Sequence, residues 1–484
     1  MFHPPSPGPI KFGTDGWRGI IAADFTFERL ALVAPIAAQV LAETYGESTG
    51  SNTVIVGYDR RFLSEQFAEA TATAVREAGF DVMLSDGYAP TPAFSWVANH
   101  RSALGALVIT ASHNPGIYSG FKVKGAFGGS VPPEVTQKIE ALLAQAPTPK
   151  QPEPGNGTLT LFNPWESGFC EALQSKVDIE LIRNAITEGK LTVFADVMHG
   201  AAASGLGRLL GVPIHEINSD RDPLFGGGAP EPLPRYLSEL SSVIATHTRR
   251  ADSGLAVGLV FDGDCDRIAA MDQHGNFLSS QILIPILIEH LATRRGFQGE
   301  LVKTISGSDL MPKVAALYNL PVFETAVGYK YIADRMLETQ VLLGGEESGG
   351  IGYGHHIPER DALLSALYLL EAIAQSNMDL SALYERLQTQ AGFFSAYDRI
   401  DLPLASMEVR ARLLNQLQSQ PLTTVAGKAV VDCLAIDGYK FRLEDGSWLI
   451  IRFSGTEPVL RLYCEAATLE QVHQTLAWAK EWAS

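Results

Sequence analysis

The chain has 484 residues, which is more than one hydrophobic core supports, so we expect three or four domains. Its 46% hydrophobic and 19% charged residues are typical of a soluble globular protein and exclude a disordered or fibrous one. The formal net charge of −17 argues against general nucleic-acid binding, although local arginines can still bind a small anion.

The cysteines and the apolar segments narrow the class of protein further. The four cysteines are scattered and form no CxxC pair, at Cys170, Cys265, Cys433 and Cys464. This spacing argues against a disulfide framework and a zinc site and fits a reducing compartment. No uninterrupted apolar segment reaches the length of a membrane span, and the first nine residues lack the apolar region of a signal peptide. We therefore expect a cytoplasmic protein that contacts no membrane.

The first part of the chain alternates helical and strand patterns. Helices are predicted over 28–45 and over 64–78, the second with Ser64 as its N-cap, and strands over 53–57, 80–84, 104–109 and 121–123. Such alternation predicts an α/β domain with a largely parallel sheet and helices on both faces.

The α/β pattern continues after a Pro-rich linker predicted over 147–157. In the second unit we expect strands over 191–195, 213–217 and 255–261 and a helix over 201–210. In the third we expect strands over 301–305, 322–325 and 341–343 and helices over 309–318 and 361–374. The last part, 393–484, has the pattern of a small α+β domain. The predicted domains are 1–155, 156–275, 276–390 and 391–484.

A serine in a tight loop is the first candidate for chemistry. The segment 110–115, T-A-S-H-N-P, follows the apolar strand over 104–109 and contains Ser112. Pro115 fixes one backbone angle of this loop, and the neighbouring glycines allow unusual ones. The Ser112 hydroxyl is then a nucleophile or a phosphate carrier, and the alternative is an ordinary Ser/Asn turn.

Three aspartates follow the strand over 255–261, at positions Asp262, Asp264 and Asp266. A loop that curls around one point would turn these carboxylates together, which suits Mg²⁺ and leaves positions for substrate or water. The alternatives are a phosphatase-type aspartyl nucleophile and a solvated acidic turn; an EF-hand is excluded because no closing glutamate follows. Arg267, directly after the acids, favours a phosphate-handling site.

Further loops carry groups suited to a sugar phosphate. Segment 452–458, R-F-S-G-T-E-P, offers hydroxyl, backbone and guanidinium donors for a phosphate, with a β-turn and buried salt bridge as the alternative. Segment 344–350, G-G-E-E-S-G-G, offers acceptors for sugar hydroxyls. Arg18, in the Gly-rich segment 11–19, is a candidate anion ligand or part of a surface turn. Lys122 is a candidate base or phosphate partner, or a solvated charge.

Together the motifs T-A-S-H-N-P, D-G-D-x-D-R, G-E-E-S-G and R-x-S-G-T-E-P strongly resemble the α-D-phosphohexomutase family, which includes phosphoglucomutases and phosphomannomutases. They occur in the family's order, and the resemblance covers essentially the whole chain. It implies an α/β fold of four domains around a central cleft: three mixed-sheet α/β domains and a C-terminal small α+β phosphate-binding domain.

The resemblance also implies roles for individual residues. It implies Ser112, His113, Lys122 and Arg18 as catalytic residues. It implies Mg²⁺ held by Asp262, Asp264, Asp266 and the oxygen of phosphorylated Ser112. The substrate-binding residues that we infer are Arg267, Lys303, Gly328, Tyr329, Lys330, Glu346, Ser348, Arg452, Ser454, Gly455, Thr456 and Arg461.

The reaction implied by the resemblance is the reversible conversion of glucose 1-phosphate to glucose 6-phosphate through phosphoserine and bound glucose 1,6-bisphosphate. Alternatively, the chain is a glucose-1,6-bisphosphate synthase that uses the same phosphoserine with another sugar bisphosphate, such as fructose 1,6-bisphosphate, as donor. A phosphomannomutase and a non-catalytic sugar-phosphate-binding protein are further alternatives. The pair Glu346-Glu347 resembles the glucose-type loop, whereas family members that use both glucose and mannose often have histidine where this chain has Gly350. The expected partners are hexose phosphates, with no nucleic acid and no membrane, and the expected state is a monomer or weak homodimer.

Overall fold

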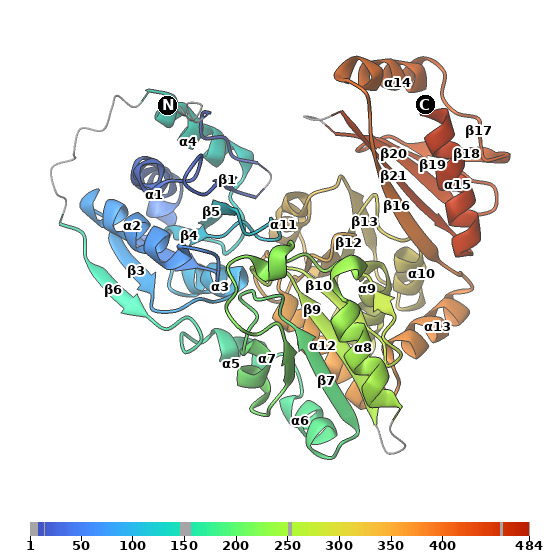
Figure 1. The fold of residues 1–484 in the computed structure, drawn as a ribbon, viewed down its shortest axis with the longest axis horizontal. Helices are drawn as coiled ribbons and strands as arrows, with labels where there is room; N and C mark the ends of the chain where they lie inside the picture. Colours follow the sequence, from blue (N-terminus) through green and yellow to red (C-terminus); the bar gives the residue numbers. More distant parts are fainter. Residues whose placement is uncertain (1–7, 14, 146–155, 250–253, 455–457, 484) are drawn as a thin grey trace.

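The computed structural model describes residues 8–13, 15–145, 156–249, 254–454 and 458–483. Its strands form four main sheets that follow one another along the chain, and helices pack beside each of them (Figure 1). The predicted linker over 147–157 lies almost entirely outside the described residues. No helix in the described part of the chain combines the length and apolarity that crossing a bilayer requires.

The first sheet has the order β1-β5-β4-β2-β3-β6. Its strands are β1 (Trp17–Ile20), β2 (Thr53–Tyr58), β3 (Asp81–Ser85), β4 (Gly105–Ile109), β5 (Tyr118–Gly125) and β6 (Leu159–Phe162). The accompanying helices are α1 (Phe27–Thr49), α2 (Ser64–Glu77), α3 (Thr91–His100) and α4 (Pro133–Gln145). The sheet is mixed, because β5 pairs antiparallel with both β1 and β4 while β2, β3, β4 and β6 run parallel. Since β6 completes this sheet, we propose that the first domain ends after it rather than at residue 155.

The second and third sheets repeat the α/β arrangement. The second has the order β11-β10-β9-β7-β8, with strands β7 (Leu191–Asp196), β8 (His215–Ile217), β9 (Leu255–Phe261), β10 (Ile268–Met271) and β11 (Phe277–Leu278). Its region contains α5 (Phe169–Gln174), α6 (Ile179–Thr187), α7 (Gly205–Leu210) and α8 (Ser238–Thr248), with short turns η1 (Phe225–Gly227) and η2 (Pro234–Tyr236).

The third sheet has the order β13-β12-β14-β15, with strands β12 (Glu300–Thr304), β13 (Val322–Thr325), β14 (Val341–Gly345) and β15 (Ile351–Tyr353). Its helices are α9 (Ser280–Glu289), η3 (His290–Arg294), α10 (Leu310–Leu317), α11 (Tyr329–Glu338), α12 (Ala362–Ser376) and α13 (Leu380–Ala391). Both sheets mix parallel and antiparallel pairs.

The last domain is a curled antiparallel sheet with the order β16-β21-β20-β19-β18-β17, flanked by two helices. Its elements are β16 (Ala396–Pro403), α14 (Met407–Ser419), β17 (Thr424–Val425), β18 (Lys428–Leu434), β19 (Tyr439–Leu443), β20 (Trp448–Phe453), β21 (Val459–Ala466) and α15 (Leu469–Trp482). The predicted phosphate loop connects β20 to β21. The four-domain fold class with a small C-terminal α+β domain is therefore confirmed.

The apolar cores separate the last domain from the other three. One continuous core includes Ile55 of the first sheet, Val257 of the second and Leu301 of the third. The last domain has its own core, and a small apolar cluster that includes Ile305 and Trp448 joins it to the third domain. In Figure 1 the last domain, in red, accordingly stands beside the third domain as a distinct body.

Two sequence-based predictions of local structure are wrong. Ser64 does not cap α2: the N-cap is Leu63, in a left-handed conformation with φ of 58°, and the Ser64 hydroxyl donates to the buried carboxylate of Asp59, at 2.8 Å. Because Asp59 is buried, its carboxylate needs hydrogen-bond donors, and the Ser64 hydroxyl is one of them. The helix predicted over 201–210 begins only at Gly205, after a turn.

Candidate active site

The Ser112 loop follows β4 and leads into β5, as predicted. Ser112 has φ of 51°, in the left-handed region, and only 1% of it is exposed. Its backbone N–H donates to the hydroxyl of Thr110, at 2.9 Å. Its own hydroxyl donates to Oδ2 of Asp262, at 2.9 Å, which joins the first domain to the second at the point where chemistry is expected.

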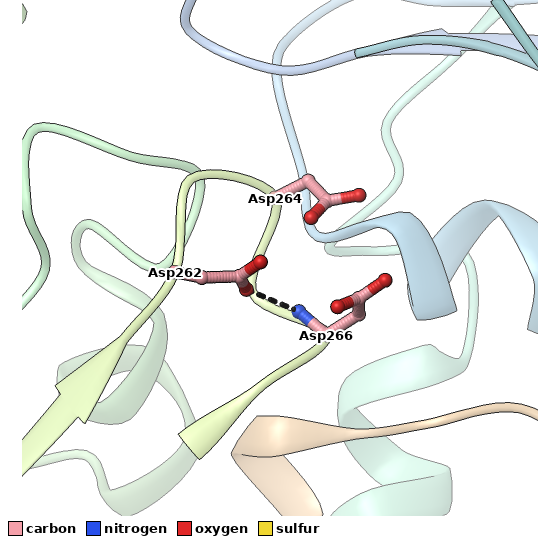
Figure 2. A group of neighbouring side chains, drawn as sticks. All are labelled: Asp262, Asp264 and Asp266. Atoms are coloured by element: carbon pink, nitrogen blue, oxygen red, sulfur yellow. Dashed lines mark hydrogen bonds between the residues drawn. The ribbon is translucent and has the colours of Figure 1, made fainter. Parts of the chain in front are cut away.

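The three aspartates lie on the loop between β9 and β10, and Figure 2 shows their carboxylates turned toward a common region. Ligand oxygens of Asp262, Asp264 and Asp266 lie within 4.8 Å of one another, and all three residues are fully buried. The loop is held in this shape because Oδ1 of Asp262 accepts from the backbone N–H of Asp266, at 2.9 Å.

This cluster fits a divalent cation on two observations. One oxygen of Asp264 and one of Asp266 are buried without a hydrogen-bond partner among the described residues, although buried polar atoms are normally paired. Burial, together with the charges of Asp266 and Asp264, raises the pKa of Asp262 well above its ordinary value. A hard cation relieves both features, and three carboxylates are the ligands that Mg²⁺ prefers.

Two protein cations contact the same carboxylates. The ammonium of Lys122 lies 2.7 Å from Asp15, 2.8 Å from Asp264 and 3.0 Å from Asp266. Burial lowers the pKa of Lys122, but these three carboxylates outweigh it and raise that pKa well above its ordinary value. Lys122 is therefore a fixed positive charge rather than a proton acceptor. The Arg360 guanidinium also bridges Asp15 and Asp266, at 2.7 Å from each.

A cavity of about 530 Å³ lies where the four domains meet. Ten predicted site residues line it: Arg18, His113, Arg267, Gly328, Tyr329, Lys330, Glu346, Ser348, Arg452 and Arg461. Ser112, Lys122 and the three aspartates do not line it and are almost fully buried. His113 and Arg267, next in sequence to Ser112 and Asp266, connect these buried groups with the cavity.

The lining residues are held by defined partners. Arg18 donates to the side chain of Asn114, at 2.6 Å. Nδ1 of His113 lies 3.4 Å from the Ser112 hydroxyl, and burial, with the nearby charges of Arg267 and Arg18, lowers the pKa of His113 to about 2. His113 is therefore a neutral imidazole at physiological pH.

The remaining predicted residues fall into three groups. Gly455 and Thr456 lie outside the described residues. Ser454 lies at the end of β20 and is 9% exposed, and its carbonyl accepts from Arg410, at 2.7 Å. Lys303 is not brought to the cavity: its ammonium is buried between the third and fourth domains, 2.8 Å from the Gly307 carbonyl and 2.9 Å from Glu324. Lys303 is also absent from the residues that line the cavity.

The glycine-rich loop supplies one glutamate to the cavity, not two. Glu346 and Ser348 line the cavity, whereas Glu347 pairs with Arg399 of the last domain, at 3.0 Å. The two histidines after this loop also have other partners, since His355 contacts Tyr368 at 2.6 Å and His356 contacts Asp361 at 3.0 Å.

Arg360 is a cavity residue that the sequence analysis missed. Only 5% of it is exposed, and it explains the glycine at position 350, because a Cβ there would lie 2.1 Å from Cδ of Arg360. The sequence did contain a sign of Arg360, because this chain has Gly350 where some family members have histidine. The arginine that occupies the space beside Gly350 lies ten residues later, so the two could not be linked from the sequence.

We predict that Gly350→Ala destabilises the chain by about 1–3 kcal/mol, the usual cost of overpacking. The free energy of unfolding in urea measures this. Arg360→Ala frees the space, so Gly350→Ala should cost much less in that background. Gly350 is not at positive φ, so backbone strain does not account for the effect. An equal cost in both backgrounds would contradict this steric explanation.

Comparison with known proteins identifies the family. Models of the phosphoglucomutase/phosphomannomutase family match in four pieces: α/β/α domain I over 9–150, domain II over 167–275, domain III over 279–390 and the C-terminal domain over 408–478. A phosphoglucosamine/phosphogalactosamine mutase of Sulfurisphaera tokodaii is 30% identical over 94% of this chain and 95% of its own length. A phosphoglucomutase/phosphomannomutase of Thermococcus kodakarensis is 29% identical over 96% of each chain.

A solved structure from Thermus thermophilus, provisionally assigned as a phosphomannomutase, is 32% identical and has a TM-score of 0.83 over 98% of this chain and 99% of its own. The fold and the site thus define an intramolecular phosphotransferase. The chain belongs to the α-D-phosphohexomutase family of phosphoglucomutases and phosphomannomutases.

Proposed function

We propose that the chain interconverts glucose 1-phosphate and glucose 6-phosphate through phosphoserine at Ser112 and a bound glucose 1,6-bisphosphate. The observation that carries this proposal is the charge of the cavity, which is strongly positive in a chain of net charge −17. Its cationic lining residues are Lys11, Arg18, Arg267, Lys330, Arg360, Arg452 and Arg461, against the acids Asp15 and Glu346. A sugar with a phosphate at each end matches this distribution.

The cations fall into two groups with different tasks. Arg18, Arg267 and Arg360 lie on the side of Ser112 and the aspartates, where a phosphoryl group is transferred. Arg452 and Arg461 come from the last domain, where a phosphate is held without reacting. Arg452 is oriented in advance by Asp437, which lies 2.9 Å from its Nε.

In the proposed cycle, the bond between phosphorus and the Ser112 oxygen breaks as a bond to O6 of glucose 1-phosphate forms. The resulting 1,6-bisphosphate turns end for end, and its C1 phosphoryl group returns to Ser112, which leaves glucose 6-phosphate. Lys122 and Arg360 neutralise charge on the transferring group. The proton of the attacking O6 hydroxyl passes to the Ser112 oxygen that leaves phosphorus. His113 lies beside that oxygen and orients it as a neutral imidazole, because its lowered pKa makes it a poor proton acceptor. The three aspartates and the phosphoserine oxygen would hold Mg²⁺, which would supply further neutralisation of that charge.

Glu346 and Ser348 are the sugar-binding groups in this proposal. The relatives named above include enzymes for glucosamine as well as glucose, so the choice of hexose rests on the loop alone. We favour glucose because the loop resembles the glucose type, although its second glutamate, Glu347, pairs with Arg399.

The test is a phosphorus NMR time course with Mg²⁺ and catalytic glucose 1,6-bisphosphate. Glucose 1-phosphate, glucosamine 1-phosphate and mannose 1-phosphate are compared, and we expect glucose to be converted fastest and nearly completely. Faster conversion of another sugar would contradict the glucose assignment. A second series adds excess fructose 1,6-bisphosphate: steady accumulation of glucose 1,6-bisphosphate would make the chain a bisphosphate synthase, and no conversion of any sugar would contradict both readings.

A further inference from the structure

A buried arginine lies beneath the Ser112 loop, outside the cavity. Arg61 follows β2, is 0% exposed, and is not among the described residues that line the cavity. Its five side-chain N–H donors match five recorded acceptors. Nε donates to Asp59 at 3.2 Å, Nη1 to the carbonyls of Pro115 and Tyr118 at 3.1 Å each, and Nη2 to the carbonyls of Ser112 and, at 2.7 Å, Asn114.

Three of these acceptors are backbone carbonyls of the loop that carries Ser112, and a fourth is the carbonyl of Tyr118, where that loop enters β5. A planar guanidinium with donors in fixed directions can gather four carbonyls in this way, whereas the three donors of a lysine ammonium cannot satisfy the same set. Arg61 therefore determines where the carbonyls of the loop point, and through them the shape of the loop.

The shape that Arg61 supports is costly for a serine. A non-glycine residue at φ of 51°, such as Ser112, is under backbone strain that the surrounding contacts must offset. With its carbonyl turned to Arg61, Ser112 has its hydroxyl 2.9 Å from Asp262. The Ser112 carbonyl also packs closely against Gly263, in the loop that carries the three aspartates: a Cβ added at Gly263 would lie 2.4 Å from the carbonyl oxygen.

Arg61 is itself fixed from two sides. The carboxylate of Asp59 pairs with its Nε and also accepts from its backbone N–H, at 3.0 Å. The ring of Phe225, from the second domain, lies over the guanidinium with 4.8 Å between the guanidinium carbon and the ring centroid. Both contacts restrict how the guanidinium can turn.

We propose that Arg61 is a positioning residue for phosphoryl transfer: by binding the carbonyls of residues 112, 114, 115 and 118 it holds Ser112 in the strained conformation that aims its oxygen at the metal cluster. The inference rests on the proposed function of Ser112 as the phosphate carrier. Among the described residues, Arg61 has no hydrogen bond to a side chain that lines the cavity. We therefore expect its loss to slow the transfer step far more than it weakens sugar-phosphate binding.

The test compares Arg61→Lys with Arg60→Lys. Arg60 is a matched control because it is also buried and adjacent in sequence, but it donates to the carbonyl of Ser219, at 2.8 Å, and has no recorded bond to the loop. For each variant we would measure kcat and KM with glucose 1-phosphate, the rate of phosphoserine formation from glucose 1,6-bisphosphate by intact mass, and Tm. A displacement of about 1 Å costs on the order of 100-fold in rate.

We expect Arg61→Lys to lower kcat and the rate of phosphoserine formation by about 100-fold with KM within about twofold, while Arg60→Lys changes each by less than about threefold. Asp59→Asn keeps Arg61 but removes the charge of its partner, so kcat should fall by less than in Arg61→Lys, again with KM nearly unchanged. If Arg61→Lys lowers Tm severely, the result with Asp59→Asn decides whether the inference holds. Wild-type kcat in Arg61→Lys, or a loss confined to KM, would overturn the inference. If wild-type Ser112 accepts no phosphoryl group, the proposed function itself fails.

Discussion

Ser112→Ala should abolish phosphoryl transfer and lower turnover by at least about 10⁴-fold, as loss of a covalent nucleophile does in other enzymes. No oxygen remains to carry the phosphoryl group between the two halves of the cycle. The fold should persist, because the hydroxyl makes one hydrogen bond to Asp262, worth about 1 kcal/mol, and alanine meets a similar backbone cost at φ of 51°.

The measurement pairs a glucose 1-phosphate assay with intact mass after incubation with glucose 1,6-bisphosphate. Wild type should gain one phosphoryl group and Ser112→Ala none. Ser119→Ala is the matched control, because Ser119 is also buried, lies seven residues later in β5, and its hydroxyl has no hydrogen-bond partner among the described residues. Full activity in Ser112→Ala, or a phosphoryl group on another residue of that variant, would refute the carrier role.

The parts of the site that the sequence predicted are those that lie within one loop at a strand end. Ser112 follows β4 and the aspartates follow β9, and both segments can be recognised as an apolar run followed by a turn with reactive groups. The Asp262–Asp266 loop carries its whole cluster within five residues. Local patterns therefore predicted the strands, the loops that follow them and the grouping of the three aspartates.

The contacts that span the chain could not be predicted in this way. Arg360 reaches Asp15 across 345 positions, and Arg61 reaches the Ser112 loop across 51 or more. An isolated arginine in a sequence is usually a surface charge, and only the folded arrangement turns these two into buried partners of the site. Lys303 shows the same limit from the other side: the sequence does not reveal that this lysine, inferred to bind substrate, pairs with Glu324.

Asp264→Asn should weaken Mg²⁺ binding by at least about 10-fold, the loss that even outer-shell changes cause, and lower turnover with it. Oδ1 of Asp264 is a buried oxygen without a recorded partner, and Oδ2 accepts from Lys122 at 2.8 Å and from Thr91 at 2.6 Å. Burial raises the pKa of Asp264, but the charge of Lys122 outweighs it and holds that pKa below its ordinary value, so the residue is an anion at neutral pH. Asparagine keeps the shape and the Thr91 bond while removing that charge.

Calorimetric titration with Mg²⁺ in the absence of sugar separates metal binding from catalysis. The control is Asp196→Asn, which also replaces a buried aspartate with an unpartnered oxygen, at the end of β7 and outside the cluster. We expect Asp196→Asn to bind Mg²⁺ as wild type does. An unchanged titration in Asp264→Asn would remove Asp264 from the metal site. Weaker metal binding with normal turnover would instead mean that Lys122 and Arg360, already in contact with these carboxylates, supply enough positive charge for transfer by themselves.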